Sequence, residues 1–234
     1  MQNKGFAIAI DGPMGVGKST VAKLLANMLG FTYIDTGAMY RAVAYYNLQN
    51  GTDFTNMSAV ASSMQNIKIE LRTVDGAQHV YLNDQDITDL IRTQEISTIT
   101  SQNIATNPAV REKLVEQQRQ MAATSAVVMD GRDIGSHVLP NAQIKIYLDA
   151  APEIRAKRRT LELESKGQPA NFAQVLTETI ERDHIDKTRP VSPLVQTPDA
   201  ILIDTGGLTP QQVAEKIAGF ESELHVIKKF LQIL

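Results

Sequence analysis

Eight residues near the start of the chain combine glycine, lysine and serine in a spacing suited to binding phosphate. They run Gly12-Pro13-Met14-Gly15-Val16-Gly17-Lys18-Ser19, between an apolar stretch at 6–10 and an apolar periodic stretch at 21–29. In a strand–loop–helix setting, the glycines let backbone N–H groups turn inward around phosphate oxygens, and the helix N-terminus adds positive charge. Lys18 can then reach the β- and γ-phosphates, and the Ser19 hydroxyl can join a Mg²⁺ shell. The pattern predicts a site for a nucleoside triphosphate rather than a glycine-rich turn that only links two elements.

A second motif, Asp130-Gly131-Arg132-Asp133, follows the apolar run at 126–129. An aspartate at the end of a buried strand can hold the Mg²⁺ of a bound nucleotide, directly or through water. The structural alternative is that Asp130 caps the segment that follows it. We take Ser19 and Asp130 as the candidate metal residues.

Clustered arginines form the next signal, because guanidinium groups bind phosphate oxygens bidentately and phosphoryl transfer needs positive charge around the migrating group. Arg132 lies in a glycine-containing loop beside the candidate metal ligand. Arg182, Asp186 and Arg189 are spaced i, i+4 and i+7, as on one face of a helix, so all three can address a single ligand. A similar cluster one helix earlier consists of Arg155, Arg158 and Arg159, and Arg41 lies in the helix expected after the second strand. For any one arginine the competing interpretation is an exposed face or an ion pair, and it is strongest for Arg155, which has carboxylates nearby.

No histidine has a spacing that suggests a general base: His79, His137, His184 and His225 are scattered along the chain. This fits an acceptor that is itself a phosphate group, because its oxygen is already ionised at neutral pH. Catalysis would then consist of positioning and charge neutralisation.

The composition excludes several classes of protein. The 234-residue chain has no cysteine, so disulfides, a cysteine-ligated zinc and a thiol nucleophile are ruled out. A net charge of −3 does not favour a nucleic acid as the main partner. We find no signal peptide and no apolar run long enough to cross a bilayer, so we expect a cytoplasmic protein that does not bind membranes.

The order of the expected elements indicates an α/β fold with a doubly wound parallel sheet. Five apolar strands are expected at 6–10, 31–34, 126–129, 144–148 and 200–203, with helices at 21–29, 38–48, 108–123, 152–166, 172–187 and from 210 onward. Ligands bind over the carboxyl ends of such strands, where Asp11, Asp35, Asp130 and Asp149 fall.

The hydrophobic pattern changes between 67 and 82, where apolar and polar residues alternate around the turn Asp75-Gly76, as in an antiparallel hairpin. We therefore expect a core formed by 1–54 and 106–234 and an inserted lobe at 55–105. The apolar tail at 230–234 is expected to pack on the core rather than to mediate self-association.

Together these segments resemble the bacterial cytidylate kinases, a branch of the P-loop nucleoside monophosphate kinases. The resemblance spans nearly the whole chain and rests on Ile10-Asp11-Gly12-Pro13, Asp35-Thr36-Gly37-Ala38-Met39-Tyr40-Arg41, Ile91-Arg92-Thr93-Gln94-Glu95, Asp130-Gly131-Arg132-Asp133-Ile134-Gly135 and Glu181-Arg182-Asp183. The P-loop is shared with many enzymes, whereas the second and fourth stretches are more specific. The match is loosest in a helix expected from Ser192 onward.

The resemblance implies a three-layer α/β/α core, an enlarged acceptor-binding insertion and Mg²⁺-dependent phosphoryl transfer from ATP to CMP or dCMP. It implies that residues from Gly12 to Thr20 bind ATP and that Lys18, Asp130, Arg132, Arg158 and Arg159 take part in catalysis. It places Thr36, Arg41, Arg132 and Arg189 around the CMP phosphate, Ser101, Arg111 and Asp133 near the cytosine, and Arg182 and Asp186 near the sugar. The arginines Arg155, Arg158 and Arg159 would belong to a short lid at about 152–170 that closes over the phosphates.

Three alternatives can be weighed on the sequence alone, of which the first is the close runner-up. The acceptor could be UMP, dTMP or AMP. A tRNA prenyl transferase shares a P-loop but calls for a basic surface, and a regulatory GTPase calls for an N-K-x-D motif; the chain has neither. The resemblance favours a monomeric kinase of small nucleotides, without nucleic acid or membrane partners.

Overall fold

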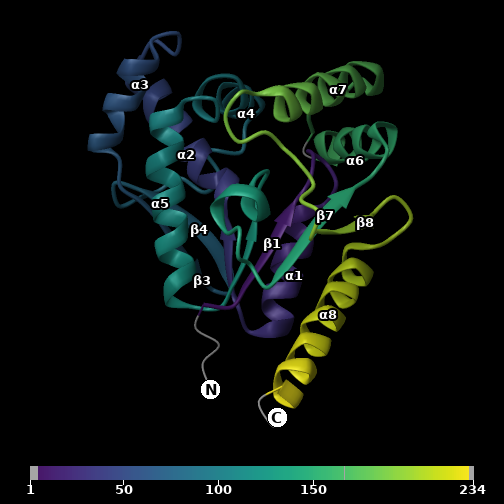
Figure 1. The fold of residues 1–234 in the computed structure, drawn as a ribbon. Coiled ribbons are helices and arrows are strands. Elements are labelled where there is room, and N and C mark those ends of the chain that lie inside the picture. The colour runs from purple at the N-terminus through teal and green to yellow at the C-terminus, as the bar shows by residue number, and fades with distance from the viewer. Residues whose placement is uncertain (1–4, 166, 232–234) are drawn as a thin grey trace.

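A computed structural model describes the chain over residues 5–165 and 167–231, with side chains described up to residue 222. Its centre is a parallel five-stranded sheet in the order β2-β6-β1-β7-β8 (Figure 1). The strands are β1 (Ala7–Asp11), β2 (Thr32–Asp35), β6 (Val127–Asp130), β7 (Ile144–Asp149) and β8 (Ile201–Asp204). This confirms the expected α/β fold class and all five expected strands.

The sheet lies between two helical layers because its strands are apolar on both faces. Ile8 and Ile10 of β1 pack with α1 (Lys18–Leu29) and α8 (Pro210–Leu231), while Ala7 and Ala9 face the opposite side. On that side lie α5 (Pro108–Thr124) and a π-helical turn at Ile134–Val138. Continuous apolar strands are typical of parallel sheets covered on both faces.

Four strands of the sheet end in the aspartates noted in the sequence: Asp11, Asp35, Asp130 and Asp149. Register places two of them directly opposite each other, Asp35 on Asp130 in the β2–β6 pair. The carboxyl ends of the strands therefore form an acidic edge, onto which the loops that follow β1 and β6 open.

Between β2 and α5 the chain builds a smaller antiparallel sheet in the order β3-β4-β5. Its strands are β3 (Ile69–Val74), β4 (Ala77–Leu82) and β5 (Gln85–Asp86), and the first two meet at the expected Asp75-Gly76 turn. Around them lie α2 (Thr36–Gln49), α3 (Met57–Ser63), a 3₁₀ turn at Met64–Asn66, α4 (Gln94–Ile99) and a π-helical turn at Thr100–Ile104. One apolar cluster joins this region to α2 and α5, including Met39, Ile87 and Leu114.

Two helices, α6 (Pro152–Ser165) and α7 (Phe172–Thr188), pack side by side above the carboxyl ends of the strands (Figure 1). Residues 189–200 then return to β8 as a loop, so the helix expected from Ser192 is wrong. Ser192 has a φ of +48° and precedes Pro193, and the residue before a proline is disfavoured in the helical region.

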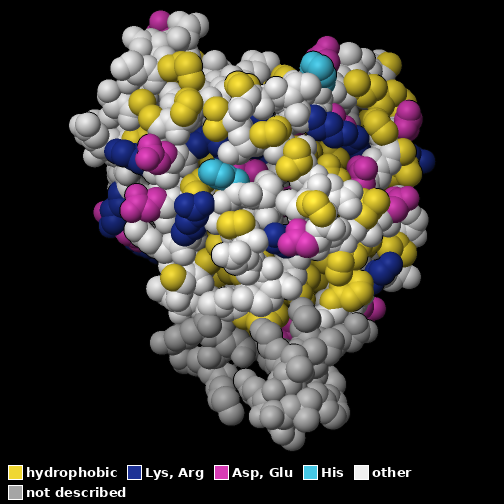
Figure 2. Space-filling model, in the orientation of Figure 1, with side chains coloured by type: hydrophobic (Ala, Val, Ile, Leu, Met, Phe, Trp, Pro, Cys, Tyr) yellow, Lys and Arg dark blue, Asp and Glu magenta, His cyan; other side chains and the backbone are white. Residues whose placement is uncertain are grey.

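On the face seen in Figure 2, acidic, basic and apolar side chains are interspersed, without a broad field of one charge. Among the described residues, no helix combines the length and apolarity needed to span a bilayer. The packing expected for the apolar tail at 230–234 lies outside the described side chains.

Candidate active site

The P-loop of the sequence forms the turn between β1 and α1. Gly12 passes so close to β7 that a Cβ placed there would lie 2.1 Å from the Leu148 carbonyl oxygen. Gly17 has a φ of 91° and caps α1, which begins at Lys18. Only glycine tolerates both positions, because one has no room for a side chain and the other is left-handed. The loop therefore presents the N-terminus of α1, a favourable place for phosphate.

Lys18 is buried in this loop and donates from Nζ to the Pro13 carbonyl at 2.7 Å. Burial, and then the nearby Arg132, lower the pKa of its ammonium well below the usual range. A phosphate at the loop would add an attraction that opposes both of these effects. Keeping the Lys18 ammonium charged in this buried position is costly, so an anionic ligand would stabilise it strongly.

Next to it, Asp130 receives hydrogen bonds from two hydroxyls. Ser19 Oγ donates to Oδ2 and Tyr33 Oη donates to Oδ1, each at 2.9 Å. Burial, and then the neighbouring Asp35, raise the pKa of Asp130 to about 6. An aspartate and a hydroxyl held together are hard oxygen ligands of the kind that Mg²⁺ takes alongside nucleotide oxygens and water. The residues present thus fit a magnesium ion bound together with a nucleotide.

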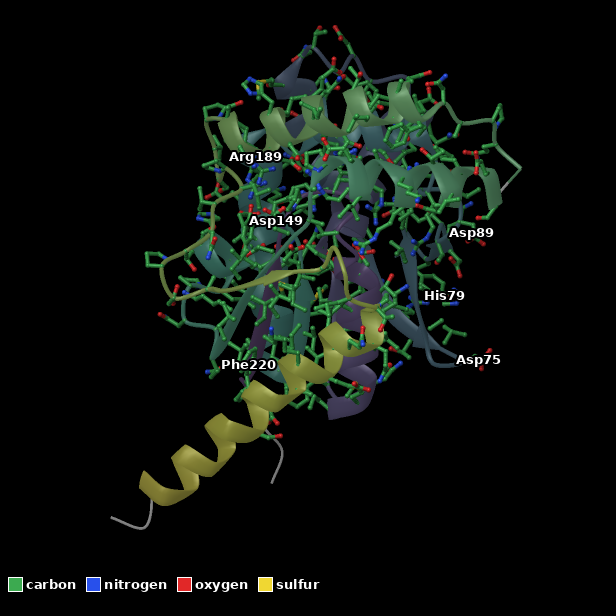
Figure 3. All side chains as sticks on the ribbon, turned by 90° about the vertical axis from the view of Figure 1, so that its right-hand side faces the viewer. Asp75, His79, Asp89, Asp149, Arg189 and Phe220 are labelled. Carbon is green, nitrogen blue, oxygen red and sulfur yellow. The ribbon has the colours of Figure 1, made fainter. Side chains whose placement is uncertain are left out.

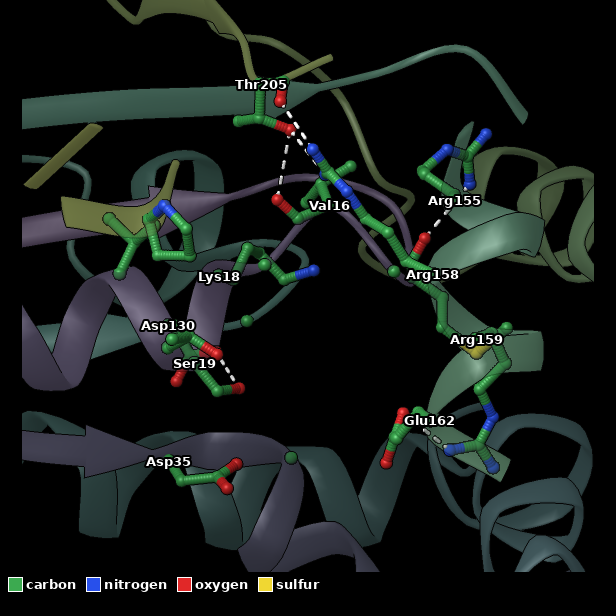
Figure 4. A pocket seen from close by; sticks show the side chains of 18 of the residues that line it. Val16, Lys18, Ser19, Asp35, Asp130, Arg155, Arg158, Arg159, Glu162 and Thr205 are labelled. Carbon is green, nitrogen blue, oxygen red and sulfur yellow. Dashed lines mark hydrogen bonds and ion pairs between the residues drawn. The ribbon is translucent and has the colours of Figure 1, made fainter. Parts of the chain in front are cut away.

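A cavity of about 1000 Å³ opens over these groups and extends to the arginines of the second half of the chain. Figure 4 shows Lys18, Ser19 and Asp130 on one side of it and Arg159 with Glu162 on another. Its cationic lining comes from α1, α2, the segment between β2 and α5, the loop after β6, α6 and α7: Lys18, Lys23, Arg41, Arg92, Arg132, Arg155, Arg158, Arg159 and Arg182. Such a cavity suits a strongly anionic ligand.

Three of the residues assigned to the acceptor phosphate and the sugar line this cavity: Arg41, Arg132 and Arg182. Arg41 pairs with Asp35 at 3.1 Å, and Arg132 pairs with Asp186 at 2.7 Å. Arg182 donates to the Ser97 carbonyl at 3.3 Å, and burial together with Arg132 lowers its pKa to about 10. The Thr36 hydroxyl, also assigned to the phosphate, donates to the Asp130 carbonyl at 2.7 Å.

The group assigned to the cytosine is buried deeper. Asp133 pairs with Arg111, and its other oxygen lies 3.6 Å from an Arg189 amino group. Arg189 thus lies next to Asp133, while Arg132 and Asp186 are also close enough to influence its pKa. Ser101 Oγ donates to the Thr98 carbonyl at 3.0 Å. Among the described residues, those lining the cavity do not include Ser101, Arg111, Asp133, Asp186 or Arg189.

The Arg111–Asp133 cluster also holds buried polar atoms that make no hydrogen bond in the described part of the chain, although one of them, an Arg189 amino group, is ion-paired with Asp133. The Tyr40 hydroxyl, Arg111 Nε and an Arg189 amino group are buried and make no hydrogen bond to the described part of the chain. Burial raises the pKa of Tyr40 to about 12, so its hydroxyl stays protonated at neutral pH. Buried polar groups without partners are costly, and a polar ligand would satisfy them.

The three arginines of α6 have different environments. Arg155 is buried, pairs with Asp183 and donates to the carbonyls of Ala150 and Met14. Its ion-pair partner is therefore 28 residues away and is not one of the neighbouring carboxylates considered in the sequence. Arg158 donates to the Thr205 carbonyl at 2.6 Å and to its hydroxyl at 3.1 Å. Arg159 bridges Glu162 and Gln94. Arg158 and Arg159 are half-buried side chains of the cavity wall, whereas Arg155 is buried and held by its ion pair with Asp183.

Sequence reasoning gave no role to several residues at this site. Arg92, Gln94 and Ser97 of the insertion line the cavity, and Arg92 and Gln94 stand in one of the matched stretches, which was a usable signal. Asp11 accepts from the backbone N–H groups of Ile134 and Gly135 at 2.8 and 2.7 Å, and so ties the loop after β1 to the loop after β6.

The geometry agrees with comparisons to known proteins. A family model described as cytidylate kinase matches residues 8–222. The cytidylate kinase of Oceanobacillus iheyensis is 46% identical over 212 residues, which cover 91% of this chain and 92% of the relative. That of Geobacillus thermodenitrificans is 47% identical over 218 residues, or 93% and 97%. The chain belongs to the cytidylate kinase family.

A solved structure of lower identity shows the fold alone. A gluconokinase from Sinorhizobium meliloti matches with a TM-score of 0.50 at 12% identity, over 96% of each chain.

One of the four histidines, His79, lies on the hairpin sheet and away from Arg189 of the candidate site. His79 bonds to Asp86 on the hairpin sheet, and Figure 3 shows it well away from Arg189 and Asp149.

Proposed function

We propose that this chain transfers the γ-phosphoryl group of ATP to CMP or dCMP, giving ADP and the corresponding diphosphate. One observation carries the proposal: a single cavity joins the P-loop to the arginines of α2, α7 and the loop after β6. A donor phosphate on the P-loop and an acceptor phosphate among these arginines would face each other across it. Holding two phosphates in line and neutralising their charge is most of what phosphoryl transfer requires.

In this mechanism the P-loop N–H groups and Lys18 bind the β- and γ-phosphates of ATP. Ser19 and Asp130 would hold a Mg²⁺, which supplies positive charge to the phosphate oxygens. Arg41 and Arg132 bind the phosphate of CMP, whose ionised oxygen attacks the γ-phosphorus without a general base. Both arginines pair with carboxylates, so each arginine would exchange a carboxylate partner for the acceptor phosphate when CMP binds.

Base selection is assigned to Asp133, supported by Arg111. A carboxylate accepts a hydrogen bond from the exocyclic amine of cytosine, whereas uracil presents an oxygen there and would set two acceptors against each other. Since these residues are buried beside the cavity rather than lining it, we propose that the acceptor separates α7 from the loop after β6 when it binds.

The residues at 55–105 would act as the acceptor-binding lobe, and those at about 152–170 as a lid. Closure would bring Arg158 and Arg159 onto the transferring phosphoryl group and exclude water. We further propose a cytoplasmic monomer, which light scattering with and without nucleotides would test.

The test is an assay of ADP release with ATP, Mg²⁺ and each of CMP, dCMP, UMP, AMP and dTMP. We expect turnover with CMP and dCMP and its loss on removal of Mg²⁺. Lys18→Ala should abolish turnover while the thermal unfolding midpoint shows a folded chain. Lys216→Ala, which removes an exposed lysine of α8, is the matched control. Turnover confined to another monophosphate would overturn the base assignment, and turnover retained by Lys18→Ala would overturn the mechanism.

A further inference from the structure

The side chain of Gln78 sits on the open edge of the main sheet. In the five-stranded sheet, the described part of β2 pairs with β6 on one side only. On the other side, the Gln78 carboxamide reaches across from β4. Its Nε2 donates to the Tyr33 carbonyl, and its Oε1 accepts from the Asp35 N–H at 3.2 Å.

These two contacts reproduce the pairing of a parallel strand. The Tyr33 carbonyl and the Asp35 N–H flank Ile34, and one residue of a neighbouring parallel strand would bond to that same pair of groups. A carboxamide offers the same donor and acceptor as a peptide group. Gln78 thus extends the sheet by a single amide, and it links segments 45 residues apart in the chain.

The end of β2 that Gln78 holds carries groups of the site. The Tyr33 hydroxyl donates to Asp130, and the Asp35 carboxylate both caps α2 through the Ala38 N–H and pairs with Arg41. A shift of this strand end would move Arg41 through its ion pair with Asp35, whereas Asp130 keeps its separate hydrogen bond from Ser19 Oγ. The hairpin sheet and the acceptor arginine are therefore linked through one side chain.

We propose that Gln78 is a positioning residue, which clamps the hairpin sheet to β2 and thereby holds Asp35 and Arg41 ready for the acceptor phosphate. The proposal rests on the proposed function for its substrate, and on the two hydrogen bonds for its geometry. Gln78 does not touch the reacting groups. Its loss should therefore affect the acceptor more than the donor, which sits at the P-loop on the far side of Asp130.

The first test replaces Gln78 by methionine, which keeps the volume but removes both hydrogen bonds. Losing both hydrogen bonds frees this end of β2, so we expect the KM for CMP to rise roughly tenfold. The KM for ATP should stay within about twofold of wild type. Gln65→Met, an exposed glutamine of the same lobe, is the control and should change neither value. An unchanged KM for CMP, or an equal rise for both substrates, would overturn the proposal.

The second test reads the clamp without any substrate, by hydrogen exchange of the Asp35 amide. Gln78→Met should expose this amide and speed its exchange roughly tenfold. Gln78→Glu keeps an acceptor for the Asp35 N–H but loses the donor to Tyr33. Its Asp35 amide should stay protected while the KM for CMP rises. Equal exchange in wild type and Gln78→Met would overturn the clamp. A wild-type chain that does not phosphorylate CMP would overturn the proposed function instead, and the exchange comparison would still decide on Gln78.

Discussion

Arg132 donates from Nε to Oδ2 of Asp186 at 2.7 Å, so the loop after β6 and helix α7 meet through one ion pair. The same pattern recurs at Arg41 with Asp35 and at Arg111 with Asp133. Each arginine that we assign to the acceptor in these pairs already has a carboxylate partner. Binding of CMP therefore exchanges partners instead of neutralising bare charges, and the carboxylates keep the arginines in place meanwhile.

The pair suggests a first prediction, for Asp186→Asn. Although burial opposes its ionisation, Arg132 and Arg182 hold the pKa of Asp186 below its usual range, so it is charged at neutral pH. Removing that charge leaves Arg132 without its partner in a mostly buried site. We expect the free energy of unfolding to fall by about 3 kcal/mol and the KM for CMP to rise. Urea unfolding and initial-rate kinetics measure the two effects, with exposed Asp89→Asn as control. A variant as stable as wild type would show that the pair contributes nothing.

A second prediction concerns Asp133→Asn. The amide can turn either its oxygen or its NH₂ group toward the base, so it can accept from cytosine or donate to uracil. Discrimination between bases by such contacts is worth about 1–3 kcal/mol, and the amide no longer rejects uracil, so the preference for CMP over UMP should fall roughly tenfold to a hundredfold.

The quantity to measure for Asp133→Asn is the ratio of kcat/KM for CMP to that for UMP. This ratio does not depend on how much of the chain is folded, which matters because the change also breaks the buried pair with Arg111. A ratio equal to that of wild type would remove Asp133 from base selection.

The sheet and the P-loop were predictable because their signals are local. Buried parallel strands are continuous apolar runs. The dipeptide Asp75-Gly76 is typical of a tight hairpin turn, and both residues have the positive φ that such a turn requires. The short helices α3 and α4 were missed, although Asn56 and Thr93 accept from Ala59 and Ile96 as N-caps. Helices of seven and six residues show little periodicity, so only the caps could have revealed them.

Contacts that depend on the tertiary fold could not be predicted. Nothing in the order of residues pairs Arg155 with Asp183, 28 residues away, or places Gln78 on β2. The two-residue strand β5 forms because β4 offers an edge, and not because Gln85 and Asp86 favour strands. The site residues were identifiable by type, but their mutual pairing was not.

A third prediction separates two neighbouring arginines of α6. Arg155→Met leaves Asp183 without its partner in a buried position, and we expect a loss of about 3–5 kcal/mol in the free energy of unfolding. Arg158→Met should leave stability within about 1 kcal/mol and reduce kcat roughly a hundredfold, because a cation on the transferring phosphoryl group acts mainly in the transition state. Chemical unfolding and kcat at saturating substrates distinguish the two. Full kcat in Arg158→Met would remove this arginine from the proposed lid.

The last prediction concerns pH and Asp11, which lies between the P-loop and the loop after β6. Burial raises the pKa of Asp11 from 3.8 to about 6, against two backbone hydrogen bonds that lower it. Below pH 3.8 the carboxyl is protonated in both the folded and the unfolded chain. Between these values the folded chain binds a proton that the unfolded chain has lost, so stability falls as pH rises toward 6. The wild type should therefore lose about 3 kcal/mol over this window relative to Asp11→Asn, which cannot titrate. Asp53→Asn is the control of opposite sign, because hydrogen bonds from Thr55 lower the pKa of this exposed carboxyl. The measurement is the unfolding free energy of wild type, Asp11→Asn and Asp53→Asn at pH 4, 5, 6 and 7. A constant difference between wild type and Asp11→Asn would mean that Asp11 stays ionised throughout and serves the two loops only as a hydrogen-bond acceptor.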